Sequence, residues 1–153
     1  MTIEIDRADF TDPRLAAFLQ DHLNEIASTT PVESRHALNL DALRASTVRL
    51  WVARQGADVA GTGALAALEP VHEELKSMRT VPVRRGNGVA TRLLDHLLAD
   101  ARTRNIQRIS LETGSTEYFA PARALYAKAG FVPCPPFGSY TPDPNSIFMT
   151  LGF

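Results

Sequence analysis

The chain has 153 residues, a length typical of one domain, so we expect residues 1–153 to form a single domain. Hydrophobic residues make up 44% and charged residues 22%, which is ordinary globular composition and excludes a disordered or fibrous chain. Sixteen Lys and Arg against seventeen Asp and Glu leave a net charge of −1, so charge gives no reason to expect nucleic acid or an anionic membrane as a partner.

The sequence near Met1 lacks the apolar run of a signal peptide, because Asp6, Arg7, Asp9 and Asp12 interrupt it. No stretch approaches the roughly 18 apolar residues needed to span a bilayer. We therefore expect a cytoplasmic protein without membrane contact.

Cysteine and histidine usage gives no sign of a metal site. A single cysteine, Cys134, excludes an internal disulfide and a multi-cysteine site, and we interpret it as structural. His22, His72 and His96 have no metal-ligand spacing with one another. We expect no metal.

The first elements of the chain are a strand and two helices. Residues 2–6 alternate as a short strand, and apolar residues at helical spacing predict a helix over 12–27, with Asp12 as its N-cap. A second helix fits roughly 33–45. Three strands then follow, over 48–54, 59–68 and 74–83, the first two joined by a hairpin turn.

The remaining elements alternate between helix and strand. An apolar stripe predicts a helix from Asn87 to about Arg104, followed by a strand over 106–113. Residues 117–129 predict a shorter helix that ends at Gly130, and strands begin at 131 and 147. This order predicts an α/β fold: a mixed sheet with helices on its faces.

A glycine-rich turn, Arg85-Gly86-Asn87-Gly88-Val89-Ala90, lies between a predicted strand and an amphipathic helix. Two glycines one residue apart allow the amides to point one way, and the helix N-terminus adds unpaired N–H groups, so the turn suits a pyrophosphate. It lacks the Gly-Lys-Ser/Thr of a Walker loop. NAD binding is disfavoured because the turn follows the fourth predicted strand instead of the first.

The turn matches the signature Gln/Arg-x-x-Gly-x-Gly/Ala in full, and a second segment reads Ala122-x-x-Leu125-Tyr126-x-x-x-Gly130-Phe131. On these motifs the chain resembles the GCN5-related N-acetyltransferase (GNAT) superfamily, strongly over 74–131 and by element order elsewhere. One departure is Phe119, at a place where many members have a cofactor-contacting Asn. Further segments resemble a bacterial subgroup that acts on small molecules.

The resemblance implies a central, mostly antiparallel sheet with helices on both faces, whose splayed fourth and fifth strands hold acetyl-CoA. It implies transfer of the acetyl group to a primary amine of a small acceptor by direct attack in a ternary complex, and many relatives form homodimers. Turn amides would hold the pyrophosphate, the backbone of Val81 and Val83 would pair with the pantetheine arm, and an amide near Met78 would face the thioester carbonyl. The implied cofactor-binding residues are Met78, Arg79, Thr80, Val81, Val83, Arg85, Gly86, Asn87, Gly88, Val89, Ala90 and Thr91.

Two residues are candidates for catalysis. The family position makes Tyr126 the general acid that protonates the departing thiolate, although helical periodicity alone favours a core tyrosine. Glu74 is the candidate base, because strand alternation places it on the side of Met78; the alternative is a solvated carboxylate. Glu112 is a rival base on the neighbouring strand.

The acceptor pocket is expected between the N-terminal helices and the loop after Phe131. Arg79 suits the carboxylate of an amino-acid-like acceptor, but a structural ion pair is the favoured interpretation. Other polar residues that could face the pocket are Ser34, Arg35, His36, Tyr140 and Asn145. Three alternatives to small-molecule acetylation stay open: a non-catalytic acyl-CoA sensor, transfer of a longer acyl chain, and acetylation of a protein or peptide amine.

Overall fold

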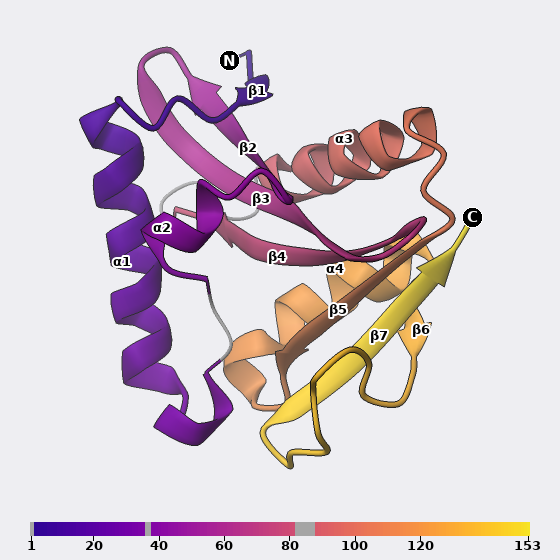
Figure 1. Cartoon of the computed structure of the whole chain (residues 1–153). Helices are drawn as coiled ribbons and strands as arrows, with labels where there is room; N and C mark the ends of the chain where they lie inside the picture. The colour runs from indigo at the N-terminus through magenta and orange to yellow at the C-terminus, as the bar shows by residue number, and fades with distance from the viewer. Residues whose placement is uncertain (1, 36–37, 82–87) are drawn as a thin grey trace.

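The structure, a computed structural model, describes residues 2–35, 38–81 and 88–153 (Figure 1). Its order of strands and helices follows the predicted one. The elements are β1 (Glu4–Arg7), α1 (Pro13–Thr29), η1 (Val32–Ser34), α2 (Leu40–Leu43), β2 (Val48–Gln55), β3 (Asp58–Glu69), β4 (His72–Thr80), α3 (Val89–Thr103), β5 (Arg108–Gly114), η3 (Glu117–Phe119), α4 (Ala120–Ala129), β6 (Val132–Pro133) and β7 (Ser146–Gly152).

Seven strands form one sheet in the order β1-β2-β3-β4-β5-β7-β6. Every neighbouring pair is antiparallel except β4 and β5, which run parallel. These two strands pair only where His72–Leu75 lies against Arg108–Leu111. Beyond this segment β4 and β5 diverge, as Figure 1 shows, so the predicted splay between them is confirmed.

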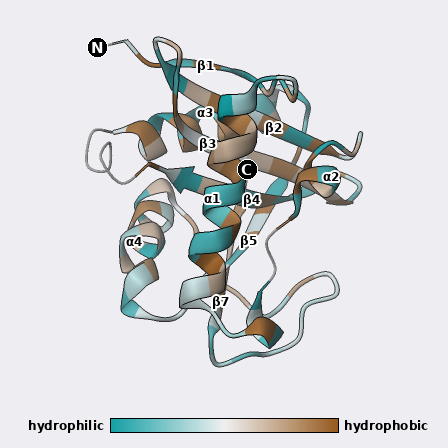
Figure 2. Ribbon diagram, turned by 90° about the vertical axis from the view of Figure 1, so that its left-hand side faces the viewer, coloured by the Kyte–Doolittle hydropathy of each residue, from teal (hydrophilic) through white to brown (hydrophobic). Residues whose placement is uncertain are grey.

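Helices cover both faces of the sheet, as predicted. The leucine stripe of α3 packs with α4 against one face, and its buried members are Leu93, Leu94, Leu97 and Leu98. On the other face, α1 and α2 bury Leu15, Phe18, Leu19 and Leu43 against β2 and β3. Figure 2 shows hydrophilic residues on the outer side of α1 and hydrophobic stretches along the strands behind it. The amphipathic stripes therefore decide which side of each helix meets the sheet.

The predicted second helix over 33–45 is wrong. The described residues of this segment form only the 3-10 turn η1 and the four-residue helix α2. Arg35 has extended backbone angles after η1, and the Asn39 side chain accepts a bond from the Ala42 amide, which starts a new helix. Such caps compete with a continuous helix, and periodicity alone does not reveal them.

A β-bulge interrupts β4 at Ser77. Arg79 lies opposite Thr62 and Lys76 lies opposite Ala64, so two residues of β4 oppose one of β3, and Ser77 has a positive φ of 55°. The extra residue shifts the alternation of side chains beyond it. Met78 consequently packs against the apolar cluster under α3.

Leu75 belongs to that same cluster, so Met78 shares the face of Leu75 and not that of Glu74. The prediction that alternation places Glu74 on the side of Met78 is therefore wrong, because alternation holds only along a strand without a bulge. Glu74 instead lies opposite Ala66, which packs toward the α1 and α2 face.

Candidate active site

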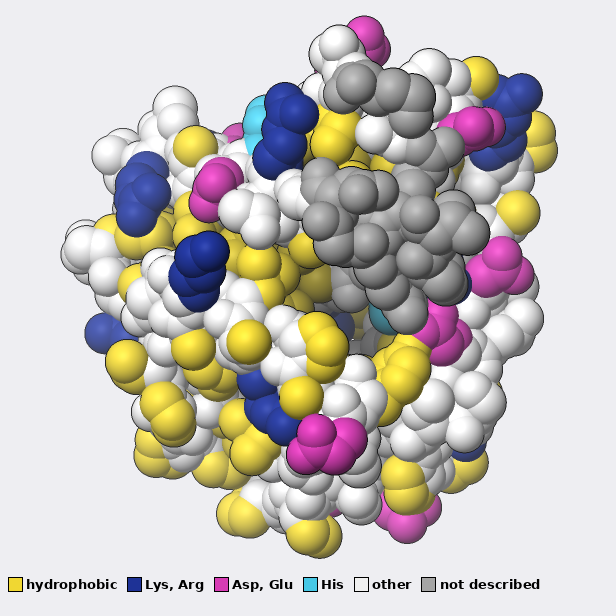
Figure 3. All heavy atoms as spheres, turned by 180° about the vertical axis from the view of Figure 1, so that it is seen from behind, with side chains coloured by type: hydrophobic (Ala, Val, Ile, Leu, Met, Phe, Trp, Pro, Cys, Tyr) yellow, Lys and Arg dark blue, Asp and Glu magenta, His cyan; other side chains and the backbone are white. Residues whose placement is uncertain are grey.

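Two cavities lie side by side where β4 and β5 separate. The larger has a volume of about 530 Å³ and the smaller about 130 Å³. Figure 3, the face opposite to the view of Figure 1, shows a hollow near the middle of the surface, with hydrophobic side chains along the described part of its rim. Six residues line both cavities: His22, Ile26, Met78, Phe119, Ala122 and Tyr126. Two molecules bound in these cavities would therefore meet at this shared wall.

The larger cavity reaches the N-terminus of α3. Gly88, Val89, Ala90 and Thr91 line it there, together with Met78, Arg79 and Thr80 of β4. Gly88 has a positive φ of 80°, and a side chain at this position would meet nothing within 4 Å. The first amides of α3 have no partner within the helix, so this end of the cavity suits an anion. Four predicted binding residues, Val83, Arg85, Gly86 and Asn87, lie outside the described residues.

Val81 takes a different place from the one predicted. Its amide donates to the carbonyl of Ala60 on β3 at 3.0 Å, so its N–H points away from the opening between β4 and β5. Its side chain packs with the cluster under α1. The amide of Val81, part of the backbone predicted to pair with the pantetheine arm, is therefore already bonded within the sheet. Because successive residues of a strand turn their main-chain groups to opposite edges, the amide of Thr80 faces the opening.

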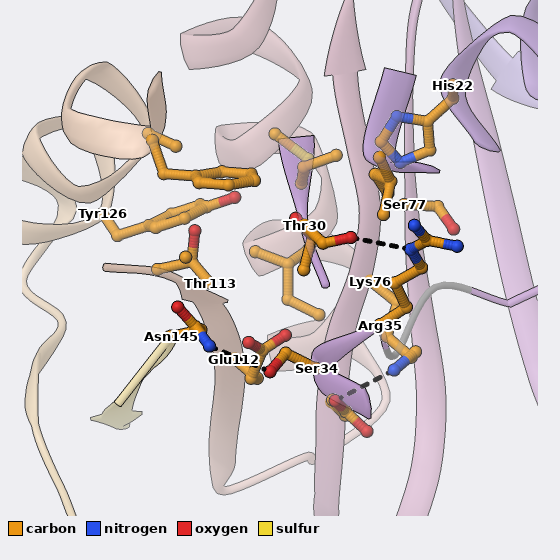
Figure 4. A pocket seen from close by; sticks show the side chains of 17 residues that line it. His22, Thr30, Ser34, Arg35, Lys76, Ser77, Glu112, Thr113, Tyr126 and Asn145 are labelled. Atoms are coloured by element: carbon orange, nitrogen blue, oxygen red, sulfur yellow. Dashed lines mark hydrogen bonds and ion pairs between the residues drawn. The ribbon is translucent and has the colours of Figure 1, made fainter. Parts of the chain in front are cut away.

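The smaller cavity lies between α1, η1 and the segment before β7. The Ser34 hydroxyl donates to the Asp143 carboxylate at 2.6 Å, and the side-chain amide of Asn145 donates to the Ser34 hydroxyl at 3.3 Å. Residues more than 100 positions apart therefore close this side of the cavity. Figure 4 shows Tyr126, Thr113 and Asn145 on one side of the cavity, with Lys76, Arg35 and His22 on the other. The predicted location for an acceptor pocket thus holds a cavity, lined by Ser34, Arg35 and Asn145. His36 lies outside the described residues.

Tyr126 lies on the wall that the two cavities share. It is 6% exposed on α4, and its ring packs edge-on against Phe131 at 5.9 Å between centroids. Burial, and then the negative charge of Glu112, raise the pKa of its phenol above the ordinary value of 10. Tyr126 therefore keeps its proton at neutral pH, the state that a proton donor needs.

Glu74 is held in a buried cluster. Its carboxylate accepts a short bond from the Tyr140 hydroxyl and a bond from Lys76 Nζ at 3.2 Å, and Lys76 also donates to the Tyr140 oxygen at 2.9 Å. Glu74 is 6% exposed, so the alternative of a solvated carboxylate at the strand start is wrong. Burial and the bond to Glu74 raise the pKa of Tyr140. Tyr140 thereby fastens the loop before β7 to the centre of the sheet.

Arg79 forms the structural ion pair that the sequence favoured. Its Nε and Nη2 donate to Glu25 Oε2 on α1 at 3.0 and 2.8 Å, and its guanidinium lies over the Phe18 ring at 4.8 Å. The side chain of Arg79 is only 9% exposed. The pair joins β4 to α1 at the edge of the larger cavity, so Arg79 serves packing and not an acceptor carboxylate.

His22 is a site residue that sequence reasoning missed. It lines both cavities, and burial, followed by the positive charge of Arg79, lowers its pKa from 6.5 to about 4. The imidazole is therefore neutral at physiological pH. Its spacing could have revealed it, since His22 lies four residues after Phe18 and four before Ile26 on the inner side of α1.

Several further expectations concern groups outside the cavities. Burial raises the pKa of the Cys134 thiol, which disfavours the thiolate form. Within the described ranges, no group of three or more His, Cys, Asp or Glu side chains could hold a metal ion. None of the helices described is long and apolar enough to cross a membrane. Phe148 of β7 is buried against Phe137 and Tyr140, with ring centroids 5.9 and 5.4 Å apart.

The sheet opens between two parallel strands, a helix N-terminus lies at one end of the opening, and two cavities share a wall. This arrangement suits a transferase that binds two substrates. The family described as Acetyltransferase (GNAT) family matches residues 8–131, and the chain belongs to this family. The protein is an acyltransferase enzyme, and members of its family use acetyl-CoA or another acyl-CoA as the donor.

Bacterial relatives span nearly the whole chain. An uncharacterized N-acetyltransferase of Bacillus subtilis, YsnE, is 44% identical over 150 residues and covers 98% of both chains. YedL of Escherichia coli, an uncharacterized N-acetyltransferase, is 43% identical over 98% of this chain and 93% of its own. An IAA acetyltransferase of Azospirillum brasilense is 42% identical over 78% of this chain and 77% of its own.

Solved structures share the fold. An acyl-CoA N-acyltransferase of Klebsiella pneumoniae has a TM-score of 0.78 and 29% identity over 99% of this chain and 97% of its own. The PaiA N-acetyltransferase of Thermoplasma acidophilum, solved with coenzyme A, has a TM-score of 0.77 over the full length of both chains, at 16% identity. The predicted GNAT-like fold is therefore confirmed.

Proposed function

We propose that this protein is a cytoplasmic N-acetyltransferase, one domain over residues 1–153, which moves an acetyl group from acetyl-CoA to the primary amine of a small molecule. The observation that carries the proposal is the meeting of two cavities of unequal size at Tyr126. The larger suits a long donor with a phosphate end, and the smaller falls below the roughly 300 Å³ at the low end of usual ligand pockets, so it suits a compact acceptor.

The amides at the start of α3 would hold the donor's pyrophosphate, with Gly88, Val89, Ala90 and Thr91 around it. The predicted residues Val83, Arg85, Gly86 and Asn87 belong to the same proposal. Met78 and Thr80 would line the arm that leads to the shared wall, where a main-chain amide of β4 can face the thioester carbonyl. Acetyl-CoA supplies an activated thioester, so the chain needs no nucleophile of its own.

Tyr126 would act as the general acid. Its proton passes to the sulfur as the C–S bond breaks, and the proton that the acceptor nitrogen sheds as the new C–N bond forms restores the phenol. The acceptor ammonium has by then lost its first proton to solvent through a basic group. The place of Tyr126 on the wall that both cavities share supports the acid role, and its phenol carries a proton at neutral pH.

The basic group is Glu74 or Glu112, both of which line the smaller cavity. Glu74 is bound by Tyr140 and Lys76, so a direct role would require one of these bonds to open. The test compares the pH dependence of kcat/KM in Glu74→Gln and Glu112→Gln with the unchanged protein. The variant that loses the acidic limb identifies the base, and a Glu74→Gln profile that overlays the unchanged protein ends the candidacy of Glu74.

The experiment that tests the whole proposal is calorimetric titration with acetyl-CoA, with NAD and ATP as controls, followed by CoA release in the presence of pooled small amines. We expect acetyl-CoA alone to bind and the pool to release CoA. Binding without turnover of small amines, but with turnover of peptides, would favour protein acetylation. Binding without any turnover would favour an acyl-CoA sensor. Tighter binding of a longer acyl-CoA than of acetyl-CoA would favour transfer of a longer acyl chain. Sedimentation would test the expected homodimer.

A further inference from the structure

The described residues that line the smaller cavity carry charges of both signs, and these charges balance. Among the described residues that line it, Glu74 and Glu112 are carboxylates and Arg35 and Lys76 are cations, while His22 is neutral because its pKa is about 4. Bringing an uncompensated charge into a partly buried site costs free energy. A cavity that is already balanced therefore favours a ligand without net charge.

The charges in this cavity are also separated. Figure 4 shows Lys76 and Arg35 on the side of the cavity opposite Tyr126 and Thr113. Glu112 lies on β5 next to Thr113, and its negative charge contributes, after burial, to the raised pKa of the Tyr126 phenol. Glu74 lies with the cations, bound to Lys76, so among the described residues that side keeps one net positive charge, while Glu112 on β5 carries the negative charge of the other side. This arrangement suits a molecule with separated charges of its own.

The two cations keep donors for a ligand. Lys76 is 11% exposed and uses its bonds to Glu74 and Tyr140, two of the three donors of an ammonium group. Arg35 Nε and Nη2 donate to the carbonyls of Thr30 and Ala27 at 2.8 Å, two of the five N–H donors of a guanidinium. These bonds fix both cations in place, because the carbonyls belong to the end of α1 and Glu74 is buried.

We propose that the acceptor is a small α-amino acid in its zwitterionic form, with the ammonium beside Glu112 and Tyr126 and the carboxylate held by Lys76 and Arg35. This inference rests on the proposed acetyltransferase function and adds the chemical class of its acceptor. A simple amine would leave Lys76 and Arg35 without a counter-ion from the ligand and add one positive charge to a balanced site. The volume of about 130 Å³ restricts the acceptor to a compact one.

The test is the initial rate of CoA release with a matched set of acceptors: L-alanine, L-alaninamide and ethylamine, with glycine and L-serine as further amino acids. The three matched acceptors share the amine and differ in the carboxylate. We expect kcat/KM for L-alanine to exceed that for either matched amine at least about tenfold, the ratio that about 1.4 kcal/mol of charge recognition gives.

The cations are tested in Arg35→Gln and in the double variant Glu74→Gln/Lys76→Met, which keeps the cavity neutral and avoids an unpaired buried carboxylate. Both variants should raise KM for L-alanine and lower its advantage over L-alaninamide. Matched controls are Arg102→Gln and Lys128→Met, which replace the same residue types on α3 and α4 away from the cavity and should leave the ratio unchanged.

The outcomes separate this inference from the function on which it rests. Failure of acetyl-CoA to bind the folded protein overturns both. Binding with equal or better turnover of L-alaninamide, ethylamine or peptides overturns the amino-acid acceptor and leaves the acetyltransferase standing. Binding without turnover of any of the amino acids has the same consequence. A preference for L-alanine that survives both cation variants overturns the assignment of Lys76 and Arg35.

Discussion

The two cavities of this protein differ in how their walls are built. At one end the larger is lined by a single contiguous segment, Gly88 to Thr91 at the start of α3, and the rest of its wall comes from α1, the end of β4, η3 and α4. The smaller brings together α1, η1, β4, β5 and the segment before β7, fastened by Ser34, Asp143 and Asn145. An end built from one local segment can be shared by a whole family, whereas a cavity of distant segments can change its lining without disturbing that end. The predictions below test this division from the largest expected effect to the smallest.

Replacing Tyr126 by Phe should lower kcat about 10²- to 10⁴-fold, the usual contribution of proton transfer to a reacting group. The ring still fills its place beside Phe131, so acetyl-CoA binding should not change. CoA release gives kcat, and calorimetry gives the affinity. If the variant binds acetyl-CoA and keeps full kcat, Tyr126 has no part in the chemistry and is a core residue.

The buried imidazole of His22 should make the protein less stable in acid. An unfolded histidine takes up its proton near pH 6.5 and the folded one near pH 4, so protonation favours the unfolded state across this window. The free energy of unfolding should rise with pH over this range and lose about 3 kcal/mol from pH 6.5 down to pH 4.

Urea unfolding at a series of pH values measures this contribution of His22. The variant His22→Gln is the control for the unchanged protein, because glutamine keeps a polar side chain that does not titrate. The difference between the two stability curves should grow above pH 4 and level off above pH 6.5. Parallel curves through this range would show that His22 titrates normally and is not buried between the cavities.

The ion pair between Glu25 and Arg79 should stabilise the wall between α1 and the larger cavity. In Glu25→Gln the Arg79 guanidinium, 9% exposed, loses its counter-ion, and we expect a loss of about 2 kcal/mol in the free energy of unfolding. Asp95→Asn on the exposed side of α3 is the matched control and should change stability by less than about 0.5 kcal/mol. Equal effects of the two variants would mean that the pair is a surface contact.

Substitutions at Gly88 and Gly56 separate an effect on stability from an effect on acetyl-CoA binding. Its φ of 80° disfavours any side chain, so Gly88→Ala should cost about 1–2 kcal/mol and also weaken acetyl-CoA binding. Gly56 in the β2–β3 turn has a similar φ of 62° and open space around it, so Gly56→Ala should cost similar stability without an effect on acetyl-CoA. Equal affinities of the two variants would remove Gly88 from the donor site.

The sequence by itself determined the class of fold, the start of α3 behind the glycine turn and the position of Tyr126 on α4. These depend on patterns within a few residues of one another: the leucine stripe of α3, the glycine turn before it and the segment from Ala122 to Phe131. Helix periodicity and turn chemistry are local properties, so they can be recognised without knowing what packs against what.

Only the tertiary structure decided how the acceptor side is arranged. The bulge at Ser77 moves Met78 to the other face from Glu74, and the partners of Glu74 and Arg79 come from Tyr140 and Glu25, 66 and 54 residues away. Neither a bulge nor the choice of a distant partner leaves a periodic signal, because both depend on which strands pair and which charges are buried together. The end of the larger cavity at α3 is therefore largely predictable from this sequence, and the arrangement of the smaller cavity is not.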